Sequence, residues 1–231
     1  MKSELLSKDE PFQKARKCCI KKFIYYFKKG YQDQKYIDWE LQYKRNAHLQ
    51  FQEVLNRRTY INLLKEKEYE QIALFAVRIE AKTNLLFSFE KIALRDAIKS
   101  PGGAKTFAIG LYDYIYGEDS LQHRFERFVQ VISSLPRKQT RVLTWPLLTV
   151  FGFIANPDEH MFLKPRVTQK AAEKYKFAFH YKSRPNWETY QSLFDFAKQI
   201  ERDTKNYSPK DYIDLQSFIW VMGSEEYPDV K

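Results

Sequence analysis

The chain has 231 residues, and its 39 Lys and Arg against 29 Asp and Glu give a formal net charge of +10. This length is enough to bury a full hydrophobic core, and 7 Gly and 9 Pro are too few for an all-β protein with many turns. Cys18 and Cys19 are adjacent, so they form neither a disulfide framework nor a zinc motif, which favours a reducing compartment. No apolar run is long enough for a membrane helix, and the first residues lack the apolar core of a signal peptide. We therefore expect a cytoplasmic protein with no membrane partner.

Apolar residues recur at helical spacing along most of the chain. In the first half, this pattern predicts helices over residues 14–27, 36–55, 58–64, 68–98, 105–116 and 120–135. Thr83 and Asn84 compete locally for backbone hydrogen bonds and are expected to break the long fourth helix, in which Phe89 and Ile92 widen the apolar stripe. Gly30 and Gly117 are expected to end helices, and residues 100–103, Ser-Pro-Gly-Gly, indicate a turn.

In the second half, residues 144–154 are almost wholly apolar. Pro146 near the start favours a buried helix, but a buried strand stays open because periodicity does not separate the two in a short apolar run. Thr168, Asn186 and the segment at 208–211 are expected to open three further helices, and Gly223 to end the last. We predict a mainly α, bundle-like single domain in which an N-terminal part (1–135) and a C-terminal part (136–231) are fused, with room for one or two short strands near 142–165.

The positive charge is concentrated in two segments. Residues 11–32 hold seven basic residues and no acid, and residues 164–184 hold seven more against Glu173 alone, so the remainder is slightly acidic. On a helix, Lys14, Lys17, Lys21 and Lys28 project within about 60° of each other, a strip that suits a phosphate backbone. A solvated helix face, a membrane surface or an acidic protein partner is compatible with the same pattern.

The second basic segment mixes its cations with aromatic residues, a composition suited to stacking unpaired bases, although such rings also belong in a core. We therefore predict contacts with DNA or RNA from both segments, which requires them to lie on one side of the fold. The predicted contact residues are Lys14, Lys17, Lys21, Lys22, Lys28, Lys29, Lys164, Arg166, Lys170, Lys174, Lys182 and Arg184.

Catalytic signals are weak. Asp158, Glu159 and His160 place titratable groups beside the apolar run and are candidates for a metal site or for acid–base chemistry. Turn and capping chemistry after Asn156 explains the same residues and is the favoured interpretation. The four histidines match no metal motif, and the chain has no phosphate-binding loop or nucleophile elbow. We expect no cofactor, and enzymatic activity stays open.

Four segments of the C-terminal half resemble a family of uncharacterised bacterial proteins. They are Leu143-Thr-Trp-Pro146, His160-Met-Phe-Leu-Lys-Pro165, Arg184-Pro-Asn-Trp187 and Asp214-Leu-Gln-Ser-Phe-Ile-Trp220. The resemblance covers about half of the chain, implies a bacterial origin and carries no activity.

The leading hypothesis is a non-catalytic nucleic-acid-binding protein, part of a bacterial DNA-processing or defence assembly. A protein-interaction subunit without a nucleic-acid role is the first alternative, and a large exposed apolar patch would favour it. A metal-dependent helical hydrolase or nuclease that uses Asp158, Glu159 and His160 is the second.

Overall fold

The computed structural model describes residues 2–138 and 141–230, with side chains from residue 11 onward. Over these ranges the chain is mainly helical and contains no strand. Short 3₁₀ turns at Gly30–Gln32 and Lys205–Tyr207 and a π-helical turn at Ile37–Leu41 supplement the α-helices. The α-helices are α1 (Lys2–Tyr26), α2 (Gln34–Tyr36), α3 (Gln42–Val54), α4 (Arg57–Lys65), α5 (Tyr69–Glu80), α6 (Ser88–Ala97), α7 (Pro101–Tyr116), α8 (Leu121–Ser134), α9 (Trp145–Ala155), α10 (Pro165–Tyr175), α11 (Trp187–Thr204) and α12 (Tyr212–Gly223).

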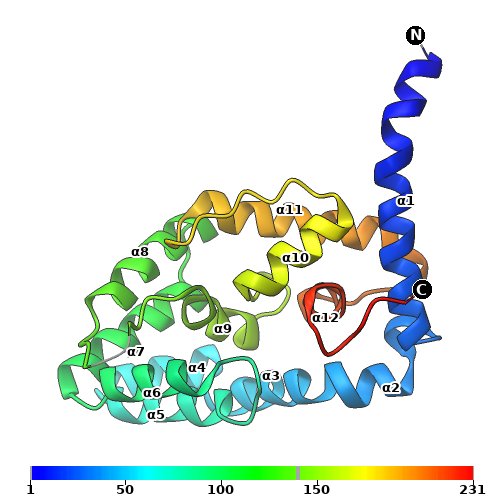
Figure 1. The fold of residues 1–231 in the computed structure, drawn as a ribbon. Helices are drawn as coiled ribbons and strands as arrows, with labels where there is room; N and C mark the ends of the chain where they lie inside the picture. Colours follow the sequence, from blue (N-terminus) through cyan, green and yellow to red (C-terminus); the bar gives the residue numbers. More distant parts are fainter. Residues whose placement is uncertain (1, 139–140, 231) are drawn as a thin grey trace.

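The helices surround a central group formed by α9, α10 and α12 (Figure 1). Helices α2 to α6 lie along one side, α7 and α8 close one end, α11 covers the opposite side, and α1 stands at the other end. Helix α1 packs on α10 and α12, and α3 packs on α9, so the N-terminal and C-terminal parts share one core. The described residues therefore form a single globular domain, as expected.

Helix α9 is the centre of this core. All of its residues are buried, as expected for a helix that is apolar on every side. Thr144 caps it by accepting a hydrogen bond from the Leu147 amide, and Pro146 lies in its first turn, where a missing N–H costs nothing. The buried helix expected at 144–154 is confirmed, and the short strands allowed for near 142–165 are not present, because this apolar run is covered by helices rather than paired with another extended segment.

Three boundaries show how tertiary context changes a local pattern. The break at Thr83 is confirmed: its hydroxyl bonds to the Glu80 carbonyl, α5 ends at Glu80, and α6 begins at Ser88. The prediction of a turn at residues 100–103 was wrong, because Ser100 caps α7 and Pro101 is the first residue of that helix. Helix α10 begins at Pro165, so Thr168 is buried inside the helix and does not cap it.

A buried polar cluster ties the C-terminal segment to α3. The Lys44 ammonium lies 3.2 Å from the Glu40 carboxylate and donates to the Ser217 hydroxyl at 2.7 Å, while the Tyr227 hydroxyl donates to Glu40 at 2.7 Å. All four residues are buried, and Glu40 belongs to the π-helical turn. Tyr227 thereby holds residues 224–230 against the body of the protein.

None of the helices within residues 2–138 and 141–230 combines the length and the apolarity that crossing a membrane requires.

Candidate nucleic-acid interface

The outer face of α1 carries exposed lysines. Cys19, Phe23 and Phe27 point into the core, so the residues on the opposite side of the helix face solvent. Lys14, Lys17 and Lys21 are exposed there, and Lys28 is exposed just beyond the helix, which ends at Tyr26. Among the side chains that the structure describes, none of these four lysines has a carboxylate within ion-pair distance.

The turn after α1 fixes how the chain leaves this face. The sequence pattern had placed Lys28 and Lys29 on the helix. In the structure both belong to this turn. Gly30 follows with φ +60°, a conformation that L side chains rarely adopt, and a Cβ there would lie 2.8 Å from Tyr207 Cδ1. The glycine therefore allows the turn after α1 to pack closely on the 3₁₀ turn Lys205–Tyr207.

The basic residues of α10 are exposed along one side of that helix. Arg166, Lys170 and Lys174 follow each other at four-residue spacing, which places them about 6 Å apart along one face. Lys176, exposed just after the helix, continues the row. Two of these cations are already paired, since Lys170 donates to Glu225 at 2.9 Å and Lys174 to Asp229 at 2.6 Å.

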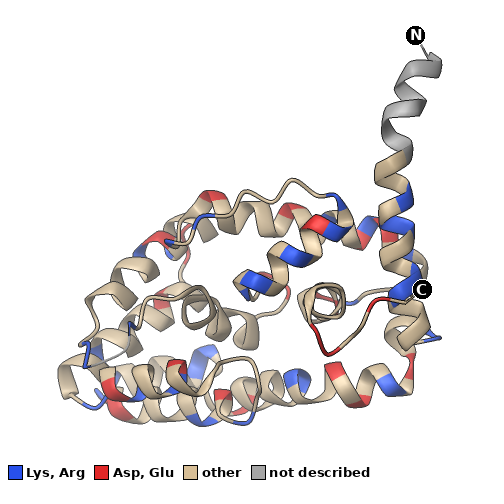
Figure 2. Cartoon of the chain, in the orientation of Figure 1, with Lys and Arg blue, Asp and Glu red and all other residues tan. Residues whose placement is uncertain are grey.

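Helices α1 and α10 meet at one carboxylate. Lys22 of α1 and Lys174 of α10 both donate to Asp229 Oδ1, at 2.8 and 2.6 Å. These hydrogen bonds, from Lys174 first and Lys22 second, hold the pKa of Asp229 below its ordinary value, whereas burial lowers the pKa of Lys22. Figure 2 shows the basic positions of α1 and α10 with acidic positions of the C-terminal segment between them. The structure therefore brings one part of the second basic segment to the first.

Lys164 lies away from this surface. It is 7 % exposed, its ammonium donates to the Leu85 carbonyl at 2.6 Å, and it stands 3.7 Å from the centroid of the Phe87 ring. Burial lowers the pKa of Lys164, and the nearby carboxylates of Glu90 and Glu80 partly oppose this effect. The Lys164 ammonium joins the residue before α10 to the segment before α6 and is not free for phosphate.

Lys182 and Arg184 lie at the far end of α11 from α1. They precede the first turn of α11, where Lys182 pairs with Glu188 and Trp187 contacts Phe125 of α8. The last turn of α11 contacts α1 through Asp203 and Arg16, and 18 helical residues span about 27 Å. The second basic segment is thus divided between the two ends of the molecule.

A groove of about 890 Å³ lies between α6, α10, α12 and the segment before α9. Its wall includes Phe87 and Phe89, which are 52 % and 51 % exposed and whose rings lie nearly parallel with centroids 5.5 Å apart. Arg141, Arg166 and Lys170 add positive charge at its edge. The remaining aromatic side chains of the wall are those of Trp145, Tyr181 and Trp220.

None of the candidates Asp158, Glu159 and His160 lines this groove, although Glu159 and His160 lie close together. Asp158 is exposed, and Glu159 is half-buried and paired with Arg124, which also donates to the carbonyls of Tyr114 and Ile115. Burial opposes the charge of Glu159, but its contacts with His160 and Arg124 outweigh burial and lower its pKa to about 2. Glu159 is therefore a fixed anion that joins α8 to the segment after α9.

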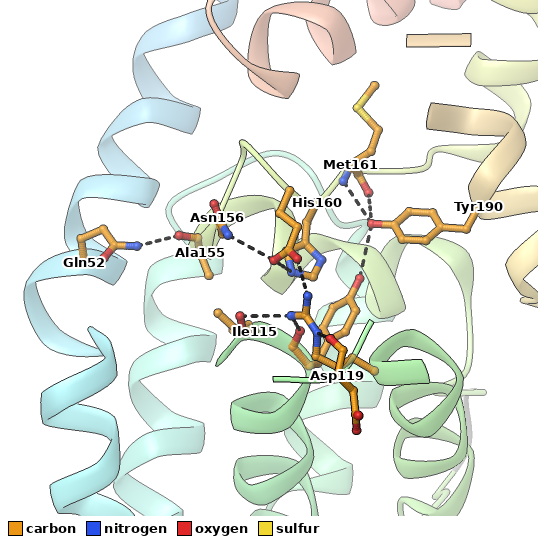
Figure 3. Close-up of polar contacts among 11 residues, drawn as sticks. Gln52, Ile115, Asp119, Ala155, Asn156, His160, Met161 and Tyr190 are labelled. Carbon is orange, nitrogen blue, oxygen red and sulfur yellow. Dashed lines mark hydrogen bonds and ion pairs between the residues drawn. The ribbon is translucent and has the colours of Figure 1, made fainter. Parts of the chain in front are cut away.

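His160 is fully buried between α7 and α9. Its ring meets Tyr114 edge to face at 4.5 Å, and Nε2 is 3.5 Å from the Glu159 carboxylate, too far and too poorly aligned for a hydrogen bond. Burial lowers its pKa, so the ring is neutral near pH 7. Figure 3 shows His160 among Asn156, Met161 and Tyr190, whose hydroxyl bonds to the backbone of Met161. Within the described ranges, no three His, Cys, Asp or Glu side chains are placed to hold a metal ion.

Comparison of the chain with protein-family models, with curated proteins and with solved structures finds no match. The resemblance to uncharacterised bacterial proteins therefore stays a prediction.

Sequence patterns missed the groove. Phe89 and Ile92 fit the apolar stripe of residues 68–98, yet both are half exposed, because α5 ends at Glu80 and a separate helix begins at Ser88, so the stripe does not continue across the break. Trp220 and Arg141 lie far apart in the sequence and meet only in the fold. The one signal available beforehand was the density of aromatic residues around the second basic segment.

Proposed function

We propose that the protein binds nucleic acid through the outer face of α1 and the adjoining cations of α10. The observation that carries this proposal is the row of Lys14, Lys17, Lys21 and Lys28, exposed and without a carboxylate partner among the described side chains. A polyanion gains most from such cations, because it neutralises them without first breaking an ion pair.

The dimensions of the row fit a phosphate backbone. Lys14 and Lys21 are seven residues apart, about 10 Å along the helix axis, which corresponds to about three nucleotides of one strand. Lysine contacts with phosphate position a strand without reading its bases, so the expected binding is independent of sequence. A place in a bacterial DNA-processing or defence assembly stays a prediction on which no comparison bears.

The test compares two variants of equal charge. The first variant replaces Lys14, Lys17, Lys21 and Lys28 by Gln. The second replaces four exposed residues of α4, α5 and α6 that have no carboxylate within ion-pair distance among the described side chains, namely Arg58, Lys65, Arg78 and Arg95. Binding to labelled single-stranded and duplex oligonucleotides of about 16 nucleotides is followed by fluorescence anisotropy at about 50 to 200 mM salt.

We expect the α1 variant to lose at least about tenfold in affinity and its dependence of log K on log salt to be shallower by about 3. The second variant should lose much less, because its charges lie on other faces. Equal losses in the two variants, or no binding of the unaltered protein to either oligonucleotide at low salt, would contradict the proposal.

A protein partner is the second candidate function. Phe87, Phe89 and Ile92, at the start of α6, are each about half exposed, and exposed aromatic clusters are typical of protein-contact surfaces. If this is the function, the protein should bind neither oligonucleotide and should self-associate more as its concentration rises. The double substitution Phe87→Ala with Phe89→Ala should abolish the self-association. Sedimentation velocity measures it.

A further inference from the structure

The groove beside Phe87 and Phe89 is followed along α10 by two smaller hollows, the second of which reaches α1. It shares Lys170 and Glu225 with a second hollow of about 410 Å³, which runs along α10 past Lys174 to Lys176. Lys176 also lines a third hollow of about 350 Å³, whose other wall is formed by Phe12 and Arg16 of α1. The three hollows share lining residues and follow one another along α10, from the aromatic groove to the side of α1 that carries Phe12 and Arg16, and we call this series the furrow.

The furrow is lined by cations at regular spacing. Arg166, Lys170 and Lys174 stand about 6 Å apart on the exposed side of α10, and Lys176 follows where the furrow reaches α1. Helix α10 therefore offers a row of charges that a phosphate backbone can follow.

The groove offers base faces a place to stack. The parallel rings of Phe87 and Phe89 are half exposed, and the buried Lys164 ammonium lies against the Phe87 ring and the Leu85 carbonyl, which fixes the ring in position. Tyr181 and Trp220 line the same groove. Bases within a duplex are stacked on their neighbours and present only their edges, so an aromatic wall of this kind accepts unpaired bases alone.

The two carboxylates that pair with the cations of α10 are exposed, and Glu90, Glu173 and Glu226 also line the furrow. Glu225 on Lys170 is 91 % exposed and Asp229 on Lys174 is 64 % exposed, and such surface ion pairs contribute little stability. A phosphate can replace Glu225 on the exposed Lys170 without leaving a buried charge unpaired. Asp229 also pairs with the buried Lys22, so a phosphate that contacts Lys174 does so beside Asp229 rather than in its place.

From the furrow, the spacing of its cations and its aromatic end, we infer that the chain takes single-stranded nucleic acid along α10, with unpaired bases in the Phe87–Phe89 groove. This inference rests on the proposed function and specifies its substrate class. Lys182 and Arg184, beside the groove residues Tyr181 and Ser183, extend the path at its far end.

The test uses the full chain and an oligothymidylate of about 16 nucleotides, free or paired with its complement. Phe87→Ala with Phe89→Ala is expected to lower affinity for the single strand at least tenfold and to leave affinity for the duplex within about twofold, since loss of stacking does not affect phosphate contacts. Leu49→Ala with Leu74→Ala, at two exposed apolar positions on α3 and α5, is the matched control and should change neither.

A third variant, Phe87→Leu with Phe89→Leu, keeps an apolar surface but removes the aromatic faces. It should bind the single strand almost as weakly as the alanine variant, because stacking needs the ring. Circular dichroism and thermal unfolding verify that all variants are folded.

The outcomes separate the two proposals. If the unaltered protein binds neither strand form, the proposed function fails. If it binds both and the alanine variant loses affinity for both or for neither, or if the leucine variant binds like the unaltered protein, the inference fails while the proposed function stands. A groove variant that alters only self-association identifies the groove as an interface between copies and overturns the inference.

Discussion

Lys22 of α1 and Lys174 of α10 donate to the same oxygen of Asp229, at 2.8 and 2.6 Å, although they are 152 positions apart in the chain. This shared carboxylate joins the two basic segments and, at the same time, neutralises part of their charge. Tyr227, bonded to the buried Glu40, holds Asp229 in place. Affinity for a polyanion should therefore depend on Asp229.

Asp229→Asn removes a negative charge from the centre of the proposed interface and should strengthen oligonucleotide binding several-fold. The dependence of log K on log salt should steepen by about 1, as expected for one added phosphate contact. Anisotropy titrations at several salt concentrations measure both. The matched control is Glu118→Gln, which removes an exposed carboxylate beside Arg57 on the α7–α8 loop and should leave binding almost unchanged. Weaker binding of the Asn variant, with its fold intact, would argue against this surface.

Lys44→Ala should destabilise the fold strongly, because it leaves the Glu40 carboxylate buried without its cation. Removing one partner of a buried ion pair costs about 3–5 kcal/mol, and urea denaturation measures the loss. Arg57→Ala, which breaks the exposed pair with Glu118, is the control and should have little effect. Equal stability of the two variants would show that the Glu40 cluster does not hold the C-terminal segment.

Stability should fall as the pH drops below about 6.5, because burial lowers the pKa of His160 in the folded state below that of the unfolded chain. The stability that depends on a neutral His160 is complete above the unfolded pKa of histidine. It is lost as the pH falls toward the lower folded pKa, because the unfolded chain then binds the proton more readily. A second loss of stability is expected from Glu159, whose pKa in the folded state is lowered to about 2. This loss should occur as the pH falls from the ordinary Glu pKa of about 4.3 toward that value.

His160→Phe tests this assignment, because neither ring nitrogen makes a hydrogen bond that the substitution would break. Urea denaturation from pH 7 to pH 5 should show a flatter dependence of stability on pH in this variant, whatever its stability at pH 7. An unaltered slope in the His160 variant would place the titration elsewhere.

Two glycine substitutions should have opposite effects. A Cβ on Gly152 would lie 2.7 Å from His160 Nδ1 and 2.8 Å from Tyr114, so Gly152→Ala should destabilise by about 1–3 kcal/mol. Gly102, in the first turn of α7, has no atom within 4 Å of an added Cβ, and Gly102→Ala should stabilise by about 0.4–1 kcal/mol. Thermal and urea unfolding compare the two, and a stable Gly152 variant would indicate that His160 has room to move.

Sequence patterns determined the helical class, the buried helix at Trp145–Ala155, the caps at Asn186 and Ser120, and the break near Thr83. These features depend on residues close together in the chain, where hydrophobic periodicity and capping chemistry act directly. The row of lysines was visible for the same reason, because Lys14, Lys17 and Lys21 share one helix and Lys28 follows shortly after its end.

Only the tertiary structure decided which charges are available and what lies beside them. Lys164 and Lys22 belong to the basic segments, yet packing buries both, and Lys170, Lys174 and Lys182 find carboxylates supplied by other parts of the chain. The Phe87–Phe89 groove likewise depends on α6, α10 and α12 meeting. Burial, ion pairing and a shared cavity are properties of contacts between distant segments, and a linear pattern of charge and hydropathy does not contain them.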